Sequence, residues 1–213
     1  MGCIQSDLSS VRGDSDKESA VPMHDNPTRS SAQPGSRAER GGRIDTTADT
    51  FHVLFWPDDA MPCKYGKHCH RKGCSFSHAR TSLVQLLEIL HASKTCMDIC
   101  VFNITCNEIA AAIIDAHKRG VKVRIVTDKD QESNQGSDID QLRRLHIPVR
   151  LNRTDGLMHH KFCIVDGRLA LTGSFNWTRA AVLQNNENLL VTSAAEVRTE
   201  YQHEFDRLWR EFA

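Results

Sequence analysis

Two residues suited to chemistry on a phosphodiester, His159 and Lys161, stand two positions apart in a segment of extended character. Because side chains alternate along a strand, both lie on one face and His160 points to the opposite face. The imidazole of His159 can attack phosphorus, while the ammonium of Lys161 neutralises charge on the non-bridging oxygens. Asp166 completes the pattern His-x-Lys-x4-Asp. The pattern predicts that His159, Lys161 and Asp166 are catalytic residues.

A second polar group follows in the segment Thr-Gly-Ser-Phe-Asn-Trp, where Ser174 and Asn176 share one face and offer hydrogen bonds to a phosphate. Further along, Glu187 provides a carboxylate that can fix the tautomer of the imidazole. The alternative is that the His-His-Lys triplet is a solvated strand end. Six polar residues at fixed offsets, within strands otherwise built for burial, favour an active site.

The stretch from His159 to Glu187 resembles the HKD signature of the phospholipase D superfamily, with its Gly-Ser-x-Asn companion. The resemblance implies a phosphohistidine intermediate and no catalytic metal, because lysines supply the positive charge. The superfamily's catalytic unit carries two signatures, with one histidine as nucleophile and the other as general acid. This chain has one signature. Its similarity to small one-signature members therefore implies a symmetric homodimer, in which His159 and Lys161 of both subunits face one phosphate.

A second cluster combines three cysteines and one histidine with the spacing Cys-x5-Cys-x4-Cys-x3-His, at Cys63, Cys69, Cys74 and His78. Such ligands at such spacing predict a closed, structural zinc site, in a C3H1-type finger at residues 62–79. The alternative is a loop with incidental thiols. Two nearby histidines, His68 and His70, compete with His78 as the fourth ligand, and His78 fits the spacing best.

The finger also carries a basic patch with interleaved aromatic residues: Lys64, Lys67, His68, His70, Arg71 and Lys72, with Tyr65 and Phe76. Such a patch suits a single-stranded nucleic acid or the headgroups of anionic lipids. Over the 213 residues, Lys plus Arg and Asp plus Glu each total 27, so the formal net charge is zero. That balance excludes a globally cationic nucleic-acid binder, and any contact with a polyanion has to be local.

A single-signature domain with a small finger after its first strand is similar to the Zucchini family of mitochondrial cardiolipin hydrolases. The similarity covers residues 50–212. The family is described as cleaving single-stranded RNA in piRNA biogenesis and as hydrolysing cardiolipin to phosphatidic acid at the mitochondrial surface. The resemblance therefore implies an endoribonuclease, a cardiolipin hydrolase, or both. A non-catalytic RNA-binding or scaffold protein is a third class, which the intact set of six polar residues disfavours.

The start of the chain departs from this family, whose members usually begin with a transmembrane helix in the mitochondrial outer membrane. No apolar run here reaches the ~18 residues that a membrane span needs, and there is no secretory signal. The opening Met-Gly-Cys-Ile-Gln-Ser predicts myristoylation of Gly2 and palmitoylation of Cys3, unless it matches by chance. Two acyl chains would anchor the protein stably on a cytosol-facing membrane.

Composition divides the chain into a tail and one domain. Every aromatic residue lies at or after Phe51, and the preceding stretch is rich in Ser, Thr, Arg, Asp, Gly and Pro. Because such a stretch cannot bury enough apolar surface to offset chain entropy, we expect residues 1–48 to be a disordered tail. Residues 49–213 then form the catalytic domain. The eight cysteines occur without an export signal, which favours reduced thiols.

Strand and helix patterns alternate through this domain. Apolar runs predict strands at 51–56, 98–102, 121–126, 148–151, 161–165, 169–172 and 189–191. Helical spacing predicts helices from Thr81 or Ser82 to about 90, at 107–119, at 139–145 and at 197–212. The order predicts an α/β phospholipase D-like domain with a central mixed sheet flanked by helices, and the finger inserted after the first strand.

Overall fold

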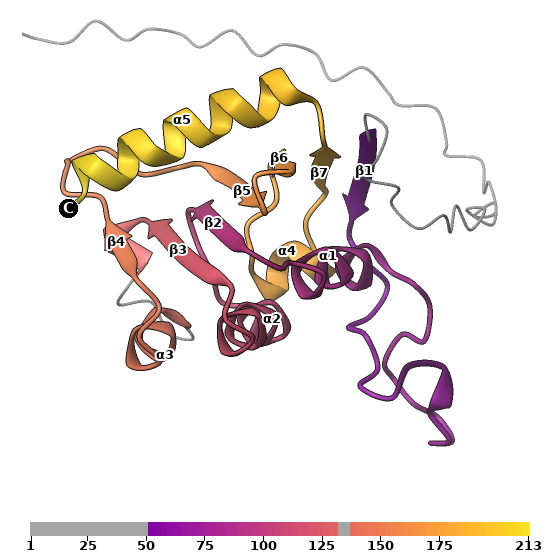
Figure 1. Ribbon diagram of the computed structural model, residues 1–213. Helices are drawn as coiled ribbons and strands as arrows, with labels where there is room; N and C mark the ends of the chain where they lie inside the picture. The colour runs from indigo at the N-terminus through magenta and orange to yellow at the C-terminus, as the bar shows by residue number, and fades with distance from the viewer. Residues whose placement is uncertain (1–50, 132–136) are drawn as a thin grey trace, which may run out of the picture. The chain divides into compact units, whose positions relative to one another are not determined.

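The computed structural model describes residues 51–131 and 137–213 (Figure 1). The predicted tail at 1–48 and the acylation sites Gly2 and Cys3 lie outside these ranges. Among the described residues, no helix has both the length and the apolar character that crossing a membrane requires.

One mixed sheet organises the described residues, with the strand order β1-β7-β6-β5-β2-β3-β4. Strands β2, β3 and β4 pair in parallel, and the remaining neighbours pair antiparallel. The mixed α/β fold class predicted from the sequence is confirmed. The strands are β1 (Phe51–Trp56), β2 (Cys96–Val101), β3 (Lys122–Thr127), β4 (Val149–Leu151), β5 (Lys161–Val165), β6 (Leu169–Gly173) and β7 (Glu187–Thr192).

Helices connect these strands and cover both faces of the sheet. Thr81 caps the first helix, since its side chain accepts a hydrogen bond from the backbone N–H of Val84. The α-helices are α1 (Ser82–His91), α2 (Asn107–Lys118), α3 (Ile139–Arg144), α4 (Arg179–Leu183) and α5 (Ala195–Glu211), and short 3-10 turns lie at Gly66–His68 and Lys129–Gln131.

Two apolar cores lie on opposite faces of the sheet, and β5 contributes to both. Its side chains alternate, so Phe162 and Ile164 pack with Phe205 of α5, whereas Cys163 and Val165 pack with the larger core under α1 and α2. Figure 1 shows α5 along one face and α1, α2 and α4 on the other. The same alternation decides toward which face of the sheet the side chains just before β5 point.

An ion-pair network fixes α5 on its face of the sheet. The guanidinium of Arg124 on β3 pairs with the buried carboxylate of Asp98 on β2 at 2.7 Å and with Asp206 of α5 at 3.0 Å. These carboxylates raise the pKa of Arg124, because they stabilise its charged form. The last helix is thereby tied to the two central parallel strands.

Four strand ends meet at one edge of the sheet. Val101 at the end of β2 pairs with Lys161 at the start of β5, and Gly173 at the end of β6 pairs with Leu189 near the start of β7. Residues that follow β2 and β6, and residues that precede β5 and β7, therefore lie together. We call this the catalytic edge.

Candidate active site

The predicted pair lies at the catalytic edge against an aromatic ring. His159 comes just before β5, and the ring of Phe102, which follows β2, meets its imidazole in a T-shaped contact with centroids 4.8 Å apart. The ammonium Nζ of Lys161 lies 5.1 Å from the centroid of the same ring and donates a hydrogen bond to the backbone carbonyl of His159 at 2.7 Å. The structure thus brings His159 and Lys161 together on one support.

Partial burial changes the pKa of the lysine of this pair. Desolvation lowers the pKa of Lys161 from its usual range, while the carboxylate of Glu187 acts in the opposite direction. A partly desolvated ammonium interacts more strongly with a phosphate oxygen than one in bulk water does. The ammonium of Lys161 is therefore suited to interact with a phosphate oxygen that lies beside His159.

The loop that carries His159 is fixed by a carboxylate that sequence reasoning missed. Asp128, fully buried after β3, accepts a hydrogen bond from the backbone N–H of Met158 at 2.7 Å. Asn152, also buried, accepts from the N–H of Lys129 at 2.8 Å and donates to the carbonyl of Gly156 at 2.7 Å. In the sequence, the feature that could have indicated this role is that Asp128 is a carboxylate directly after a buried strand.

Ser174 and Glu187 contact each other where β6 and β7 begin to diverge. The hydroxyl of Ser174 donates to the carboxylate of Glu187 and accepts from the N–H of Asn188 at 3.1 Å. A Cβ at Gly173 would lie 2.1 Å from the carbonyl oxygen of Asn188, so only glycine permits this approach. Glu187 also accepts from the side chain of Asn185 at 3.1 Å. In the described structure Glu187 supports Ser174, whereas the sequence predicted that it orients the imidazole.

Two side-chain amides at the same edge have buried oxygens without a hydrogen-bond partner among the described residues. They belong to Asn176, predicted from the sequence, and to Asn103, which was not. Their segments are joined, because the N–H of Trp177 donates to the carbonyl of Asn103 at 3.0 Å. An amide can turn either its N–H₂ or its oxygen toward a ligand. Both side chains thus have a hydrogen-bonding capacity that the described residues do not satisfy.

The structure places Asp166 away from this group. It follows the far end of β5, where its carboxylate accepts hydrogen bonds from the N–H groups of Lys94, Thr95 and Cys96 at 2.7–3.1 Å. Burial acts to raise its pKa, but these donors outweigh burial and the pKa is lowered. Five residues of strand span about 16 Å. The structure therefore places Asp166 with the start of β2, away from His159 and Lys161, and its catalytic role stays a prediction.

His160 points away from the catalytic pair, as strand alternation predicts. Its Nε2 lies 3.3 Å from a carboxylate oxygen of Glu204 on α5, and its ring contacts that of Phe162. The imidazole is therefore on the α5 face of the sheet, opposite the face that carries Lys161.

The finger brings its four predicted ligands together between β1 and α1. The donor atoms of Cys63, Cys69, Cys74 and His78 all lie within 4.8 Å of one another. A ladder-like pair of hydrogen bonds closes the loop, from the N–H of Cys63 to the carbonyl of Ser77 at 2.7 Å and from the N–H of Ser77 to the carbonyl of Met61 at 2.8 Å. The cluster can hold a metal ion, and the histidine in it is His78.

The donor set fits a tetrahedral metal. The Sγ atoms of Cys63 and Cys74 lie 3.8 Å apart, and thiolates bound at ~2.3 Å to a tetrahedral centre are about 3.8 Å apart. A hydrogen bond from the backbone N–H of Tyr65, together with the neighbouring ligands and against burial, lowers the pKa of Cys63 to about 7. Such a thiol loses its proton to a metal readily.

The outer surface of the finger is basic and aromatic. The side chains of Tyr65 and Phe76 are 50% and 44% exposed, and the guanidinium of Arg71 stacks 5.3 Å from the centroid of Tyr65. Lys64, Lys67 and Lys72 are exposed around them. The basic patch that the sequence predicts as a binding surface for a polyanion is therefore exposed to solvent.

Comparison with known proteins extends these observations. The family model described as "Cardiolipin synthase, PLD-like domain" matches residues 86–209. A mitochondrial cardiolipin hydrolase from Chlamydomonas reinhardtii is 44% identical over 187 residues, covering 86% of this chain and 81% of that protein. The protein of the same name from Homo sapiens is 41% identical over 139 residues, covering 65% of this chain and 55% of that protein.

Two solved structures have the same fold. Nuc from Salmonella typhimurium, a phospholipase D family member, superposes with a TM-score of 0.64 at 24% identity, covering 78% of this chain and 97% of that one. NucT from Helicobacter pylori gives a TM-score of 0.61 at 22% identity, covering 77% and 98%. With His159 and Lys161 joined at the edge of this fold, the chain belongs to the phospholipase D-like family and is a phosphodiester hydrolase.

Proposed function

We propose that this phosphodiester hydrolase acts on cardiolipin and releases phosphatidic acid. The observation that carries the proposal is the packing of His159 and Lys161 on the ring of Phe102, in a chain with relatives named mitochondrial cardiolipin hydrolase at 44% and 41% identity. A nucleophile beside a fixed cation is the arrangement that displacement at phosphorus requires.

In the first step, an imidazole nitrogen of His159 forms a bond to phosphorus, and the bond from phosphorus to one glycerol oxygen breaks. A second imidazolium gives its proton to that oxygen, which leaves as the hydroxyl of phosphatidylglycerol. In the second step, water attacks phosphorus, its proton passes to the second imidazole, and the bond to His159 breaks. The product is phosphatidic acid. Lys161 and the amide of Asn176 hold the non-bridging oxygens, and Ser174 joins them when its hydroxyl turns from Glu187 to the phosphate.

The second imidazole comes from a second copy of the chain in this proposal. The neighbouring histidine, His160, faces α5 and binds Glu204, so it cannot reach the same phosphate from its position. In a two-fold symmetric dimer, each copy presents the same edge, and two His159 residues meet at one site. One acts as nucleophile and the other as acid.

The experiment that tests the substrate uses purified full-length protein in EDTA with cardiolipin vesicles, and follows phosphatidic acid by mass spectrometry. We expect phosphatidic acid and phosphatidylglycerol in equal amounts. His159→Asn should abolish both products, and Lys161→Ala should lower the rate on the order of 10²-fold or more. His203→Asn, an exposed histidine on α5, is the matched control and should keep wild-type turnover. Cleavage of a simple diester without cleavage of cardiolipin would contradict the proposed substrate.

Single-stranded RNA is the second candidate substrate, and the exposed basic and aromatic surface of the finger supports it. Bases stack on rings such as those of Tyr65 and Phe76, while lysines track the phosphates. End-labelled RNA in the same buffer distinguishes the two functions. Replacing Lys64, Lys67 and Lys72 with alanine should weaken RNA cleavage, with a shallower salt dependence, before it affects a small diester.

We propose zinc as the metal of the finger. Three thiolates and one imidazole are ligands that zinc prefers, and the 3.8 Å spacing of two sulfurs supports a tetrahedral ion. With four protein ligands the coordination would be closed. Zinc bound there would stabilise the fold of the finger. It would take no part in the reaction of His159 and Lys161 at the catalytic edge.

We propose that the protein works at the mitochondrial outer membrane. The support is the name of its relatives, which are described as mitochondrial. The opening Met-Gly-Cys-Ile-Gln-Ser supports anchoring by acyl chains on Gly2 and Cys3. Metabolic labelling with an alkyne analogue of myristate, compared between wild type and Gly2→Ala, tests the anchor.

A further inference from the structure

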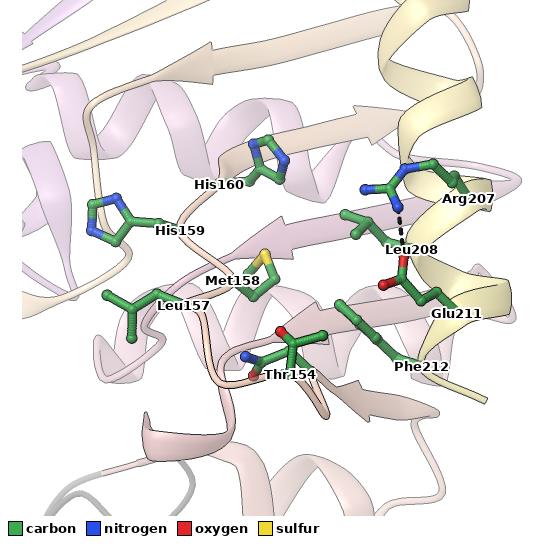
Figure 2. A pocket seen from close by; sticks show the side chains of 10 residues that line it. Thr154, Leu157, Met158, His159, His160, Arg207, Leu208, Glu211 and Phe212 are labelled. Atoms are coloured by element: carbon green, nitrogen blue, oxygen red, sulfur yellow. Dashed lines mark hydrogen bonds and ion pairs between the residues drawn. The ribbon is translucent and has the colours of Figure 1, made fainter.

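A pocket of about 390 Å³ lies between the loop before β5 and the C-terminal end of α5. Figure 2 shows Leu157 and His159 at one end of this pocket, residues of α5 at the other, and Met158 between them. We call it the loop–helix pocket. Its volume is within the range of pockets that bind small molecules. His159 is the one lining residue that the chemistry proposed above uses.

Part of its lining is apolar. Met158, Leu208 and Phe212, which line the pocket, are buried members of the core between the sheet and α5. Leu157 stands at the end of the pocket shared with His159, and 59% of it is exposed. Covering this side chain with an apolar group of a ligand would be favourable, because it removes apolar surface from water.

The polar side chains on the loop side are engaged within the protein. The amide of Asn152 is held at both ends, by the N–H of Lys129 and the carbonyl of Gly156. The hydroxyl of Thr154 donates to the same carbonyl at 3.3 Å. These groups are therefore not aimed at a ligand.

The charged side chains on the helix side are engaged in the same way. The guanidinium of Arg207 donates to the carboxylates of Glu204 and Glu211, which raise its pKa further above the usual range. His160 shares Glu204. A ligand group that needs hydrogen bonds would lose those it makes to water and gain none here, at a cost of ~1–3 kcal/mol for each group. Because these polar side chains already have partners, an apolar group loses less than a polar group on entering the pocket.

We propose that the loop–helix pocket binds the acyl-glycerol part of a phospholipid whose phosphate is at His159. This inference rests on the proposed cardiolipin hydrolase function and deepens it. Leu157 and His159 are two residues apart, so at most about 7 Å of chain separates them. A group bonded to the phosphate reaches the mouth of the pocket over that distance. A nucleobase fits less well, because the polar edge of a base needs partners.

The test compares two substrates that share the same chemistry. One is cardiolipin in detergent mixed micelles, and the other is bis(4-nitrophenyl) phosphate, which has no acyl chain. We expect Leu157→Ser to lower the ratio of kcat/KM for cardiolipin to kcat/KM for the small diester by about tenfold, as loss of one leucine contact predicts. Leu157→Met should restore the ratio. Val53→Ser, at an apolar β1 residue that is 44% exposed and outside the pocket, should leave the ratio unchanged.

Each other outcome has a defined meaning. An unchanged ratio in Leu157→Ser, or an equal fall in Val53→Ser, would overturn the pocket assignment and leave the proposed function standing. Wild-type protein that cleaves the small diester but not cardiolipin would overturn the proposed function, and the pocket assignment with it. A selective loss of single-stranded RNA cleavage in Leu157→Ser would assign the pocket to a base instead.

Discussion

The ring of Phe102 packs against the imidazole of His159, with their centroids 4.8 Å apart and their planes at 61°. The same ring carries the ammonium of Lys161. One aromatic side chain therefore contacts both members of the proposed catalytic pair, and it follows a different strand, β2. It limits the rotation of the imidazole and removes water from one side of the ammonium. We infer that Phe102 is a positioning residue.

Phe102→Ala should lower kcat for bis(4-nitrophenyl) phosphate by about tenfold, since a cation–π contact contributes ~0.5–2 kcal/mol. Burial lowers the pKa of Lys161, so removing the ring should let that pKa rise toward its usual range. The carboxylate of Glu187, which faces Lys161 from another segment, remains in the variant. The alkaline limb of the kcat profile should therefore move to higher pH.

Phe102→Tyr keeps the ring and should restore both kcat and the position of the alkaline limb. Circular dichroism of the alanine variant serves as the control for folding. A uniform loss of activity with an unmoved alkaline limb would show that Phe102 acts only as packing.

The local pattern was enough to predict that His159 and Lys161 lie together, but not which residues support them. His159 and Lys161 are two positions apart, so strand alternation alone puts them on one face. Phe102 and Asp128 are distant in the sequence and reach the site because β5 inserts between β2 and β6 and because β3 lies beside β2. The hydrophobic periodicity of a single segment does not indicate which strands become neighbours in the sheet. The sequence therefore predicts the reactive groups better than the residues that hold them.

The same reason explains why the sequence did not indicate the position of Asp166 or the presence of helix α4. The sequence motif groups Asp166 with His159. In the structure, the length of strand β5 lies between them. Helix α4 has five residues, too few to show a helical period, and it is set by Thr178, whose side chain accepts from the N–H of Ala181 at 3.1 Å. The longer elements were predicted to within a few residues, because their apolar periods run over several turns.

Asp166→Asn should destabilise the protein by roughly 1 kcal/mol, because a neutral amide is a weaker acceptor for the N–H groups of Lys94 and Thr95. Asparagine tolerates the backbone of this turn, where φ is 55°. The carboxylate has a pKa below 3.8 in the folded protein, so its stabilisation is complete above the unfolded pKa and is lost as pH falls through the folded pKa. The difference in Tm between wild type and variant should therefore shrink below about pH 4. A variant that loses turnover with an unchanged Tm would instead support a catalytic role.

Purified protein should contain one zinc ion per chain by mass spectrometry of the metal. Cys69→Ser removes a ligand and should lower Tm by several degrees, since metal binding contributes directly to folding. The rate on a small diester should change less, because the finger lies in a separate loop from His159. Cys96→Ser, at a partly buried cysteine on β2, is the matched control and should keep the zinc. A folded, active protein without zinc would contradict the proposed metal.

The last prediction concerns the second imidazole. Displacement at phosphorus through His159 needs a separate acid for the leaving oxygen, and His160 is turned toward Glu204 on α5. If a second copy supplies the acid, specific activity should fall when the protein is diluted below the dissociation constant of the dimer. Analytical ultracentrifugation over the same concentrations should show dimer giving way to monomer.

Mixed dimers make this test independent of dilution. When wild type is co-expressed with a tagged His159→Asn chain, each mixed dimer holds one histidine at its shared site. Such dimers, isolated through the tag, should have activity at least about 10²-fold below wild type, because loss of general acid catalysis typically costs 10²–10⁴-fold. Tagged His203→Asn in the same mixture should leave activity unchanged, since that side chain is exposed on α5. Mixed dimers with half of the wild-type activity, or a monomer with full specific activity, would contradict the shared site and require an acid within one chain.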